Sequence, residues 1–285
     1  MPASLVAATG PTLSGCAVFP ATSWWNRRVD SLPVDPSSAT YIASIGLTAS
    51  LHPDFSATRS YGIPYNVVTA ATKRTTVKFT YAAESDQVGY PIPASPLIEG
   101  GSDHHLLMLD KDACRLYELY AVKKSGTKWA AGSGATWDLS SNTVRPAGWT
   151  SADAAGLPIL PGLVRYDEVA AGAILHAIRF TAPSTQRKYV YPARHFASTS
   201  TNPALPPMGL RVRLKGSVDI SGFGPNAQVV LTALKRYGML LADNGSPWYI
   251  TGAPDSRWDD NEMHALGRLT GADFEVVDTS GWTIP

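Results

Sequence analysis

The carboxylates of a predicted strand and of the long segment after it are the first candidates for chemistry. Side chains alternate along the predicted strand Arg115–Val122, so Glu118 shares a face with apolar and aromatic neighbours. A carboxyl group in such surroundings has a raised pKa and can act as a general acid. Glu118 therefore fits one half of the carboxyl pair of a glycosidase, whose members lie about 5–9 Å apart. The candidate partners are Asp153, Asp167, Glu168, Asp138 and Glu99.

Each carboxylate also has a structural alternative. Glu118 could pair with an arginine of a neighbouring strand, and Asp153 could cap a helix or a turn. The adjacent pair Asp167 and Glu168 could lie at a solvated strand edge. Spacing along the chain does not give the distance between side chains, so both interpretations stay open.

Aromatic side chains are the candidate sugar-binding surfaces, because tryptophan and tyrosine combine an apolar ring with a polar group. Trp149 lies inside the long segment Ser140–Val169, and Trp258 lies between Arg257 and Asp259. Core packing is the alternative for each of them. The predicted substrate-binding residues are Trp149, Trp258, Tyr166, Arg165 and Trp137.

Three histidines form an alternative site. His105 and His176 fall on the apolar faces of predicted strands, and His195 follows the end of another. Inward imidazoles on neighbouring strands could bind zinc or copper. His105 or His176 could instead be the base of a polysaccharide lyase, with Tyr166 or Tyr191 as the acid. A histidine on an apolar face is more often a hydrogen-bonded core residue, so we favour neither a metal nor a cofactor.

Several functional classes are excluded or disfavoured. The 24 Lys+Arg and 23 Asp+Glu leave a net charge of +1, which argues against nucleic-acid binding through bulk positive charge. No window of about 18 apolar residues predicts a membrane span. The sequence contains no Gly-x-Ser-x-Gly elbow, no phosphate-binding Walker loop and no dinucleotide fingerprint.

The elements that must position these side chains are mainly strands. The chain is poor in Glu and Lys, which favour helices, and contains 24 Gly and 22 Pro, which favour turns. Many short β-branched or aromatic runs between turn residues predict a mainly β, single-domain sandwich or jelly roll. Capping residues and apolar periodicity predict three peripheral helices. Their expected ranges are Pro36–Ile45, Pro225–Tyr237 and Asn261–Leu269.

Two segments between the predicted strands stand out. Ser140–Val169 is too rich in proline and glycine for regular structure and too apolar for a disordered linker, so it predicts a functional loop or a cover over one end of a sheet. Asp243–Gly245 predicts a tight hairpin turn between the strands Met239–Asp243 and Trp248–Thr251. The alternative is that Asp243 and Asn244 bind a ligand.

The two cysteines, Cys16 and Cys114, are an even number and predict one disulfide in an exported protein. Two unrelated thiols are the alternative. Residues 1–15 have neither a basic start nor a continuous apolar core, and we expect a flexible leader there. Residues 16–285 are expected to form the single β-rich domain.

Several segments resemble a family of uncharacterised secreted bacterial proteins. The longest is RPAGWTSADAAGLPILPGLVRYDEV, residues 145–169, and shorter ones include FPATSWWN and YGMLLADNG. The resemblance covers nearly the whole chain and implies a single exported unit. It implies no activity, so the function is argued from the residues.

These observations favour an extracellular, monomeric enzyme that hydrolyses glycosidic bonds of a polysaccharide with a carboxylate acid and base. A non-catalytic carbohydrate-binding or cell-surface protein would use the same aromatic residues without paired carboxylates. A histidine-based metal enzyme or lyase is the third possibility. The sugar, the linkage and the stereochemical outcome do not follow from the sequence.

Overall fold

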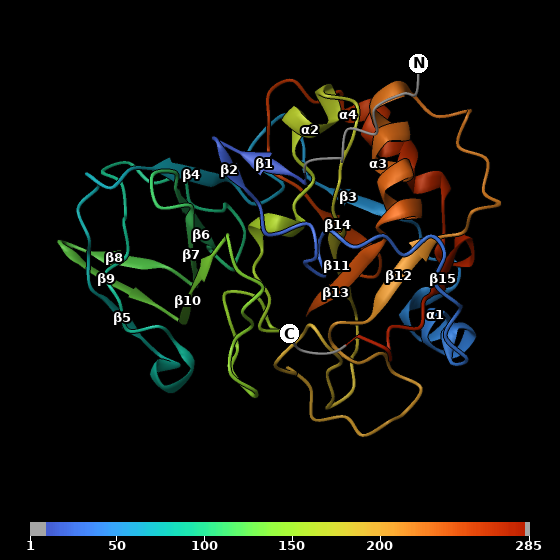
Figure 1. Cartoon of the computed structure of the whole chain (residues 1–285), viewed down its shortest axis with the longest axis horizontal. Coiled ribbons are helices and arrows are strands. Elements are labelled where there is room, and N and C mark those ends of the chain that lie inside the picture. The colour runs from blue at the N-terminus through green and yellow to red at the C-terminus, as the bar shows by residue number, and fades with distance from the viewer. Residues whose placement is uncertain (1–9, 283–285) are drawn as a thin grey trace, which may run out of the picture.

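The computed structural model describes residues 10–282 and shows a mainly β, single-domain, sandwich-like fold (Figure 1). A four-stranded sheet has the order β10-β7-β6-β4, and a three-stranded sheet has the order β5-β9-β8. The strands of these two sheets are β4 (Tyr65–Val68), β5 (Val77–Phe79), β6 (Leu106–Asp110), β7 (Arg115–Tyr120), β8 (Lys123–Ser125), β9 (Lys128–Ala131) and β10 (Ser133–Asp138).

A larger mixed sheet of six strands has the order β15-β12-β13-β11-β14-β3. Its members are β3 (His52–Asp54), β11 (Ile178–Ala182), β12 (Arg211–Leu214), β13 (Met239–Asn244), β14 (Tyr249–Thr251) and β15 (Phe274–Val276). A two-stranded ribbon of β1 (Thr12–Leu13) and β2 (Cys16–Ala17) lies near the start of the described chain. The predicted leader, residues 1–15, is described only from residue 10, and that part already includes β1.

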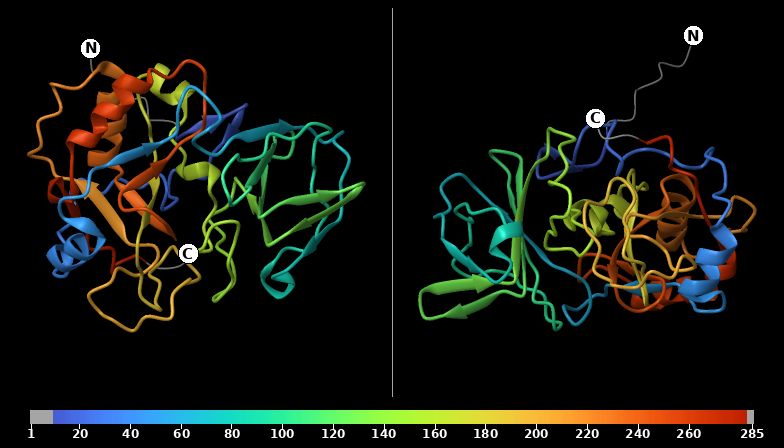
Figure 2. Two further views of the ribbon diagram at one scale, coloured as in Figure 1. Left: turned by 180° about the vertical axis from the view of Figure 1, so that it is seen from behind. Right: turned by 90° about the horizontal axis from the view of Figure 1, so that it is seen from below.

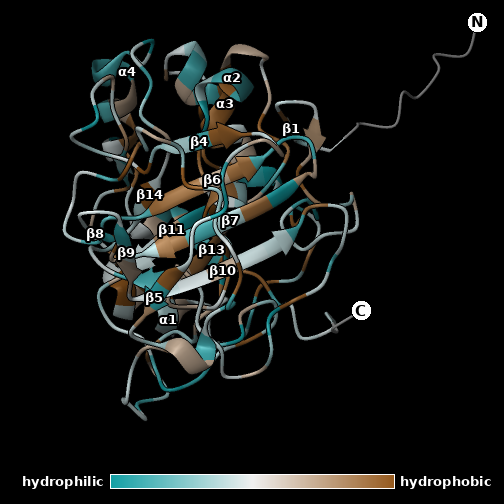
Figure 3. Cartoon of the chain, turned by 90° about the vertical axis from the view of Figure 1, so that its left-hand side faces the viewer, coloured by the Kyte–Doolittle hydropathy of each residue, from teal (hydrophilic) through white to brown (hydrophobic). Residues whose placement is uncertain are grey.

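The four-stranded sheet is buried on both faces, which explains why β6 is an unbroken apolar run. Leu106 and Met108 face a small core shared with the three-stranded sheet, and Leu107 and Leu109 face the main core. Successive side chains of a strand point to opposite faces, so a run without alternation is expected where both faces are covered. Figure 3 shows β6 as brown over most of its length.

Within residues 10–282, four α-helices lie around the six-stranded sheet (Figure 2). They are α1 (Ser38–Gly46), α2 (Tyr166–Ala170), α3 (Pro225–Arg236) and α4 (Asp260–His264). Three match the predicted helices, with the third shortened because α4 continues as a 3₁₀ helix, Ala265–Arg268. Asp259 caps α4 through the backbone N–H groups of Asn261 and Glu262.

The segment Ser140–Val169 runs between the four-stranded and six-stranded sheets. Ser151–Arg165 is almost wholly buried and contains only a short 3₁₀ helix, Leu160–Gly162. The segment is therefore an internal layer whose ends reach the surface. The predicted irregular structure holds up to Arg165, apart from this short helix, and residues 166–169 belong to α2. The segment is buried between two sheets and does not merely cover one end of a sheet.

One prediction about strand pairing is wrong. β13 and β14 do not form a hairpin, because β11 lies between them and pairs with β13 in parallel and with β14 in antiparallel orientation. The predicted strand Lys188–Tyr191 is also replaced by irregular chain with one isolated bridge, Tyr189 to Met208. The turn residues 243–245 do not indicate that β11, from an earlier part of the chain, pairs between the two strands.

The predicted disulfide is confirmed. Cys16 and Cys114 are bonded, with their Cα atoms 5.4 Å apart. The bond ties the β1–β2 ribbon to the turn between β6 and β7. Within residues 10–282, none of the helices has the length and apolar character to cross a membrane.

Candidate functional site

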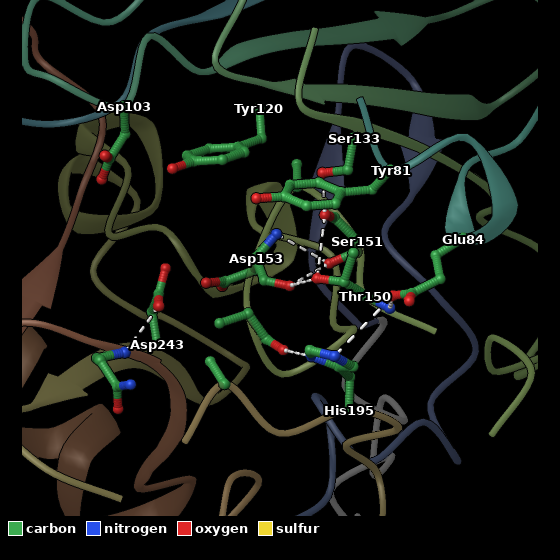
Figure 4. Close-up of a pocket in the computed structure, with 14 residues that line it drawn as sticks. Tyr81, Glu84, Asp103, Tyr120, Ser133, Thr150, Ser151, Asp153, His195 and Asp243 are labelled. Atoms are coloured by element: carbon green, nitrogen blue, oxygen red, sulfur yellow. Dashed lines mark hydrogen bonds and ion pairs between the residues drawn. The ribbon is translucent and has the colours of Figure 1, made fainter. Parts of the chain in front are cut away.

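The main site candidate is a cavity of about 470 Å³ between the four-stranded and six-stranded sheets, named here the central cavity (Figure 4). It opens where several strands end, so loops supply most of its wall. Its lining residues with ionisable or hydroxyl side chains are Tyr81, Glu84, Asp103, Tyr120, Ser133, Thr150, Ser151, Asp153, His195 and Asp243. A cavity of this size is typical of small-ligand sites.

A buried arginine lies behind the cavity wall and joins three elements. Arg179 of β11 forms a two-pronged ion pair with Asp153, with Nε–Oδ2 and Nη2–Oδ1 distances of 2.7 and 2.8 Å. The same Nη2 lies 3.4 Å from Oδ2 of Asp243, and Nη1 donates to the hydroxyl of Thr251 at 2.7 Å. The long segment and the ends of β13 and β14 are thus fixed relative to one another.

Asp153 is the counter-ion of Arg179 and is closed to ligands. Its side chain is fully buried, and both carboxylate oxygens accept from the guanidinium. The residue itself lies in the wall of the central cavity. The predicted catalytic role of Asp153 therefore gains no support from its geometry.

Asp243 differs because its carboxyl group reaches the cavity. Its side chain is 24% exposed, and Oδ1 accepts the backbone N–H of Asn244 at 2.7 Å. Burial, and secondly the negative charge of Asp153, raise the pKa of Asp243 to about 7, although Arg179 and His105 act in the opposite direction. A carboxyl group of this kind can hold a proton near neutral pH and release it to a ligand.

Asp103 approaches the same part of the cavity from the loop before β6. Tyr120, the last residue of β7, lies near both carboxylates, and its pKa is raised by burial and then by Asp103 and Asp243. Figure 4 shows the side chains of Asp103 and Asp243 directed toward each other beside the Tyr120 ring. Asp103 and Asp243, which are 140 residues apart in the sequence, thus line the same cavity, and both act on the phenol of Tyr120.

Glu84 and His195 form the other end of the cavity in Figure 4. Nδ1 of His195 donates to the carbonyl of Ala154 at 2.8 Å, which leaves Nε2 directed toward the Glu84 carboxylate at 3.9 Å. Oε2 of Glu84 also accepts the backbone N–H of Thr150 at 3.1 Å.

Residues 150–154 line one wall of the cavity, and this stretch is held by hydrogen bonds to its backbone. The Ser133 hydroxyl donates to the carbonyl of Ser151 at 2.5 Å, and the Ser151 hydroxyl bonds the carbonyls of Asp153 and Leu157. Gly156 has φ +71°, and a Cβ there would lie 2.5 Å from the carbonyl oxygen of Trp149. This tight turn requires glycine.

Glu118 lies outside the cavity. It is fully buried, and its two oxygens accept the backbone N–H groups of Ile159 and Leu160 at 2.8 to 3.1 Å. Burial raises its pKa to about 8, although these amides favour the ionised form. The expected raised pKa is found, but the carboxyl group anchors the long segment to β7 and is not exposed to a substrate.

Asp167, Tyr166 and Arg165 line a second cavity of about 460 Å³. Arg257 lies over the Tyr166 ring at 4.4 Å and pairs with Asp167 at 2.8 Å. Trp258 is buried beneath Tyr166 and donates its indole N–H to Ala253. Trp258 is therefore a packing residue, and the predicted carboxylates and aromatic residues do not converge on one site.

Glu168 belongs to a buried ion cluster. Its oxygens pair with Nη2 of Arg165 at 2.5 Å and with Nε2 of His176 at 3.1 Å. Burial works against the charged form, but the positive groups of His176 and Arg165 outweigh it and lower the pKa of Glu168. An ionised carboxylate held in this way is poorly suited to proton donation.

Trp137 and Trp149 lie on either side of Arg145, whose guanidinium carbon is 5.9 and 5.4 Å from the two ring centres. Trp137 is buried, and Trp149 is half-buried. Neither lines the central cavity. Of the two, Trp149 retains surface for a ligand.

The three histidines do not form a metal site. Both ring nitrogens of His105 bond to oxygen, Nδ1 to Glu99 at 2.6 Å and Nε2 to Ala152 at 3.0 Å. Burial opposes charge on His105, but Glu99 outweighs it and raises the pKa. Both nitrogens of His176 likewise contact oxygen. Across residues 10–282, no three or more His, Cys, Asp or Glu side chains are grouped to hold a metal ion.

Sequence reasoning missed Asp103, Glu84 and Tyr81 as site residues and considered Asp243 only as an alternative ligand contact. Asp243 carried a usable signal, because it ends an apolar strand where a polar side chain can reach a sheet edge. Asp103 lies in an irregular segment and Glu84 ends a short 3₁₀ helix, Ala82–Glu84, and neither has a distinguishing sequence pattern. Comparison with known proteins gives no match: no family model, no curated protein and no solved structure shows significant similarity to the chain.

Proposed function

We propose that this protein is an exported enzyme that hydrolyses glycosidic bonds of a polysaccharide in the central cavity. The observation that carries the proposal is the partly buried carboxyl group of Asp243, which faces the carboxyl group of Asp103 beside Tyr120. An acid and a base on opposite sides of a sugar bond are what glycoside hydrolysis requires.

The roles follow from the environment of each group. Asp243 donates its proton to the glycosidic oxygen as the carbon–oxygen bond breaks. Asp103, which is exposed, takes a proton from the water that attacks the anomeric carbon, so one water is added across the bond. The Tyr81 and Tyr120 rings offer faces for the sugar.

Export is supported by the Cys16–Cys114 disulfide, because such bonds persist mainly in oxidising compartments. The resemblance to secreted bacterial proteins points the same way. The second candidate function is a carbohydrate-binding protein without activity. It becomes the preferred one if the test below finds no cleavage.

The test is the release of oligosaccharides from a panel of neutral, amine-bearing and acidic polysaccharides, followed by mass spectrometry. Wild-type protein is expected to release saturated products, and Asp243→Asn and Asp103→Asn are each expected to lower the rate at least about 100-fold. Asp219→Asn, the same change in an exposed loop remote from the cavity, is the matched control. Equal rates in Asp243→Asn and wild type would refute the assignment.

The pH profile gives a second test. Because Asp243 must be protonated and its pKa is raised to about 7, cleavage is expected to fall as the pH rises through about 7. The groups that set this value are Asp153, Arg179, His105 and the N–H of Asn244. A profile that is flat from pH 6 to 9 would argue against Asp243 as the acid.

A further inference from the structure

The charge of the central cavity restricts the class of glycan that it can hold. Within residues 10–282, its lining contains four acidic residues and one histidine but no lysine or arginine, and of the four only Asp153 has both carboxylate oxygens held by Arg179. A uronate or sulfated sugar would bring a like charge into a partly enclosed space, where charges are screened less than in bulk water. The cavity is therefore poorly suited to polyanionic glycans.

Arg179, the guanidinium nearest the cavity, does not change this conclusion. It directs three nitrogens to Asp153, Thr251 and Asp243 and is itself buried. Its charge is offset by the bound carboxylate of Asp153. A substrate anion thus finds no positive group to bind at this wall.

The end of the cavity away from Asp103 and Asp243 is suited to a cation. Glu84 is 38% exposed there, and its Oε2 accepts the backbone N–H of Thr150 and lies 3.9 Å from Nε2 of His195. Its Oε1 accepts no hydrogen bond from the residues that the structure describes and remains available to a ligand. Tyr81 is 53% exposed and lies between Glu84 and Tyr120 in Figure 4. An ammonium group is attracted both by a carboxylate and by the face of a tyrosine ring.

We infer that the polysaccharide carries free, protonated amino groups, as a polymer of unacetylated amino sugars does, and that Glu84 selects for them. This inference rests on the proposed function, because the sugar bond is cleaved at the Asp103–Asp243 end. The amine of a neighbouring sugar unit then binds at Glu84, with the ring of Tyr81 beside it.

The test compares three hexasaccharides: glucosamine, N-acetylglucosamine and galacturonic acid. The kcat/KM for the glucosamine hexamer is expected to exceed that for the acetylated hexamer by at least about 10-fold. The preference is expected to shrink with added salt. In Glu84→Gln the ratio of the two kcat/KM values should fall about 10-fold, whereas the charge-matched control Asp219→Asn should keep the wild-type ratio.

The outcomes separate this inference from the proposed function. Cleavage of the acetylated or the acidic hexamer at an equal or higher kcat/KM overturns the inference and leaves glycoside hydrolysis standing. If none of the three hexamers is cleaved, the proposal of hydrolysis is overturned for these sugars. Binding measurements then test whether the cavity prefers a sugar with a free amine. Calorimetry showing tighter binding of the glucosamine hexamer, weakened in Glu84→Gln, supports the amine site, and equal binding of all hexamers overturns it.

Discussion

Replacement of Glu118 by glutamine tests whether this carboxyl group anchors the long segment or takes part in catalysis. Its pKa is raised from 4.5 to about 8, first by burial. Because the folded pKa lies above the unfolded one, the folded state binds more protons between about pH 4.5 and pH 8. The free energy of unfolding therefore decreases as the pH rises through this window, by at most about 1.4 kcal/mol per pH unit.

The variant Glu118→Gln is neutral at every pH, so the difference between wild type and variant isolates this group. Near pH 4 the variant is expected to be about 1 kcal/mol less stable, because an amide NH₂ replaces an oxygen that faces the N–H of Ile159. Across the window the wild type loses about 3–5 kcal/mol relative to the variant. The variant is therefore expected to be the more stable protein at pH 8.

The assay is urea unfolding of both proteins at each pH from 4 to 8, with the slope m compared to confirm that the same surface is exposed. A stability difference that stays constant over this range would refute the reasoning, since it would mean that Glu118 is already ionised in the folded state. Cleavage activity gives an independent check. If folded Glu118→Gln loses activity, the catalytic role expected from the sequence regains support over the anchoring role.

Three further results are expected. Asp243→Asn should become more stable relative to wild type as the pH rises from about 4 to 7, because the folded pKa of Asp243, about 7, lies above its ordinary value of 3.8. Urea unfolding of both proteins measures this, and a stability difference that does not change with pH would contradict it. Arg179→Met should lower the free energy of unfolding by about 3–5 kcal/mol, because Asp153 is left buried without its partner. Urea unfolding measures this loss, and a value below about 1 kcal/mol would contradict the prediction. Joint replacement of Cys16 and Cys114 by serine should lower the free energy of unfolding by up to about 4–5 kcal/mol, since the disulfide closes a loop with a sequence separation of 98. Thermal unfolding of wild type and variant, with and without reductant, measures this loss, and an unchanged midpoint would argue against the disulfide.

The fold could be predicted in class but not in pairing. Short β-branched and aromatic runs predicted most strands, and the cap at Asp259 predicted the start of α4. The position of β11 between β13 and β14 could not be predicted, because β11 lies about 60 residues earlier in the chain and its pairing depends on tertiary contacts. A turn signal describes four residues, whereas strand order is a property of the whole sheet.

The site shows the same limit at the level of single side chains. Alternation along β7 placed Glu118 on a buried face, and the structure bears this out. Its hydrogen-bond donors, the N–H groups of Ile159 and Leu160, come from 41 and 42 residues further on and were not predictable from local pattern. Asp103 and Asp243 meet only because the two sheets lie on either side of the same buried segment.

That buried segment couples the stability of the fold to the chemistry of the cavity. Asp153 neutralises most of the positive charge of Arg179. The carboxyl group of Asp243, which lies near the same guanidinium nitrogen, is therefore stabilised less in its charged form. Burial beside a neighbouring carboxylate then raises the pKa of Asp243 into the neutral range. One arginine shared unequally between two aspartates thus gives a structural ion pair with Asp153 and, in the function proposed above, leaves Asp243 as the proton donor. The charge of Asp153 is the second cause of the raised pKa of Asp243, after burial, so Asp153→Asn should lower the pKa of Asp243 and move the alkaline limb of the cleavage profile to lower pH.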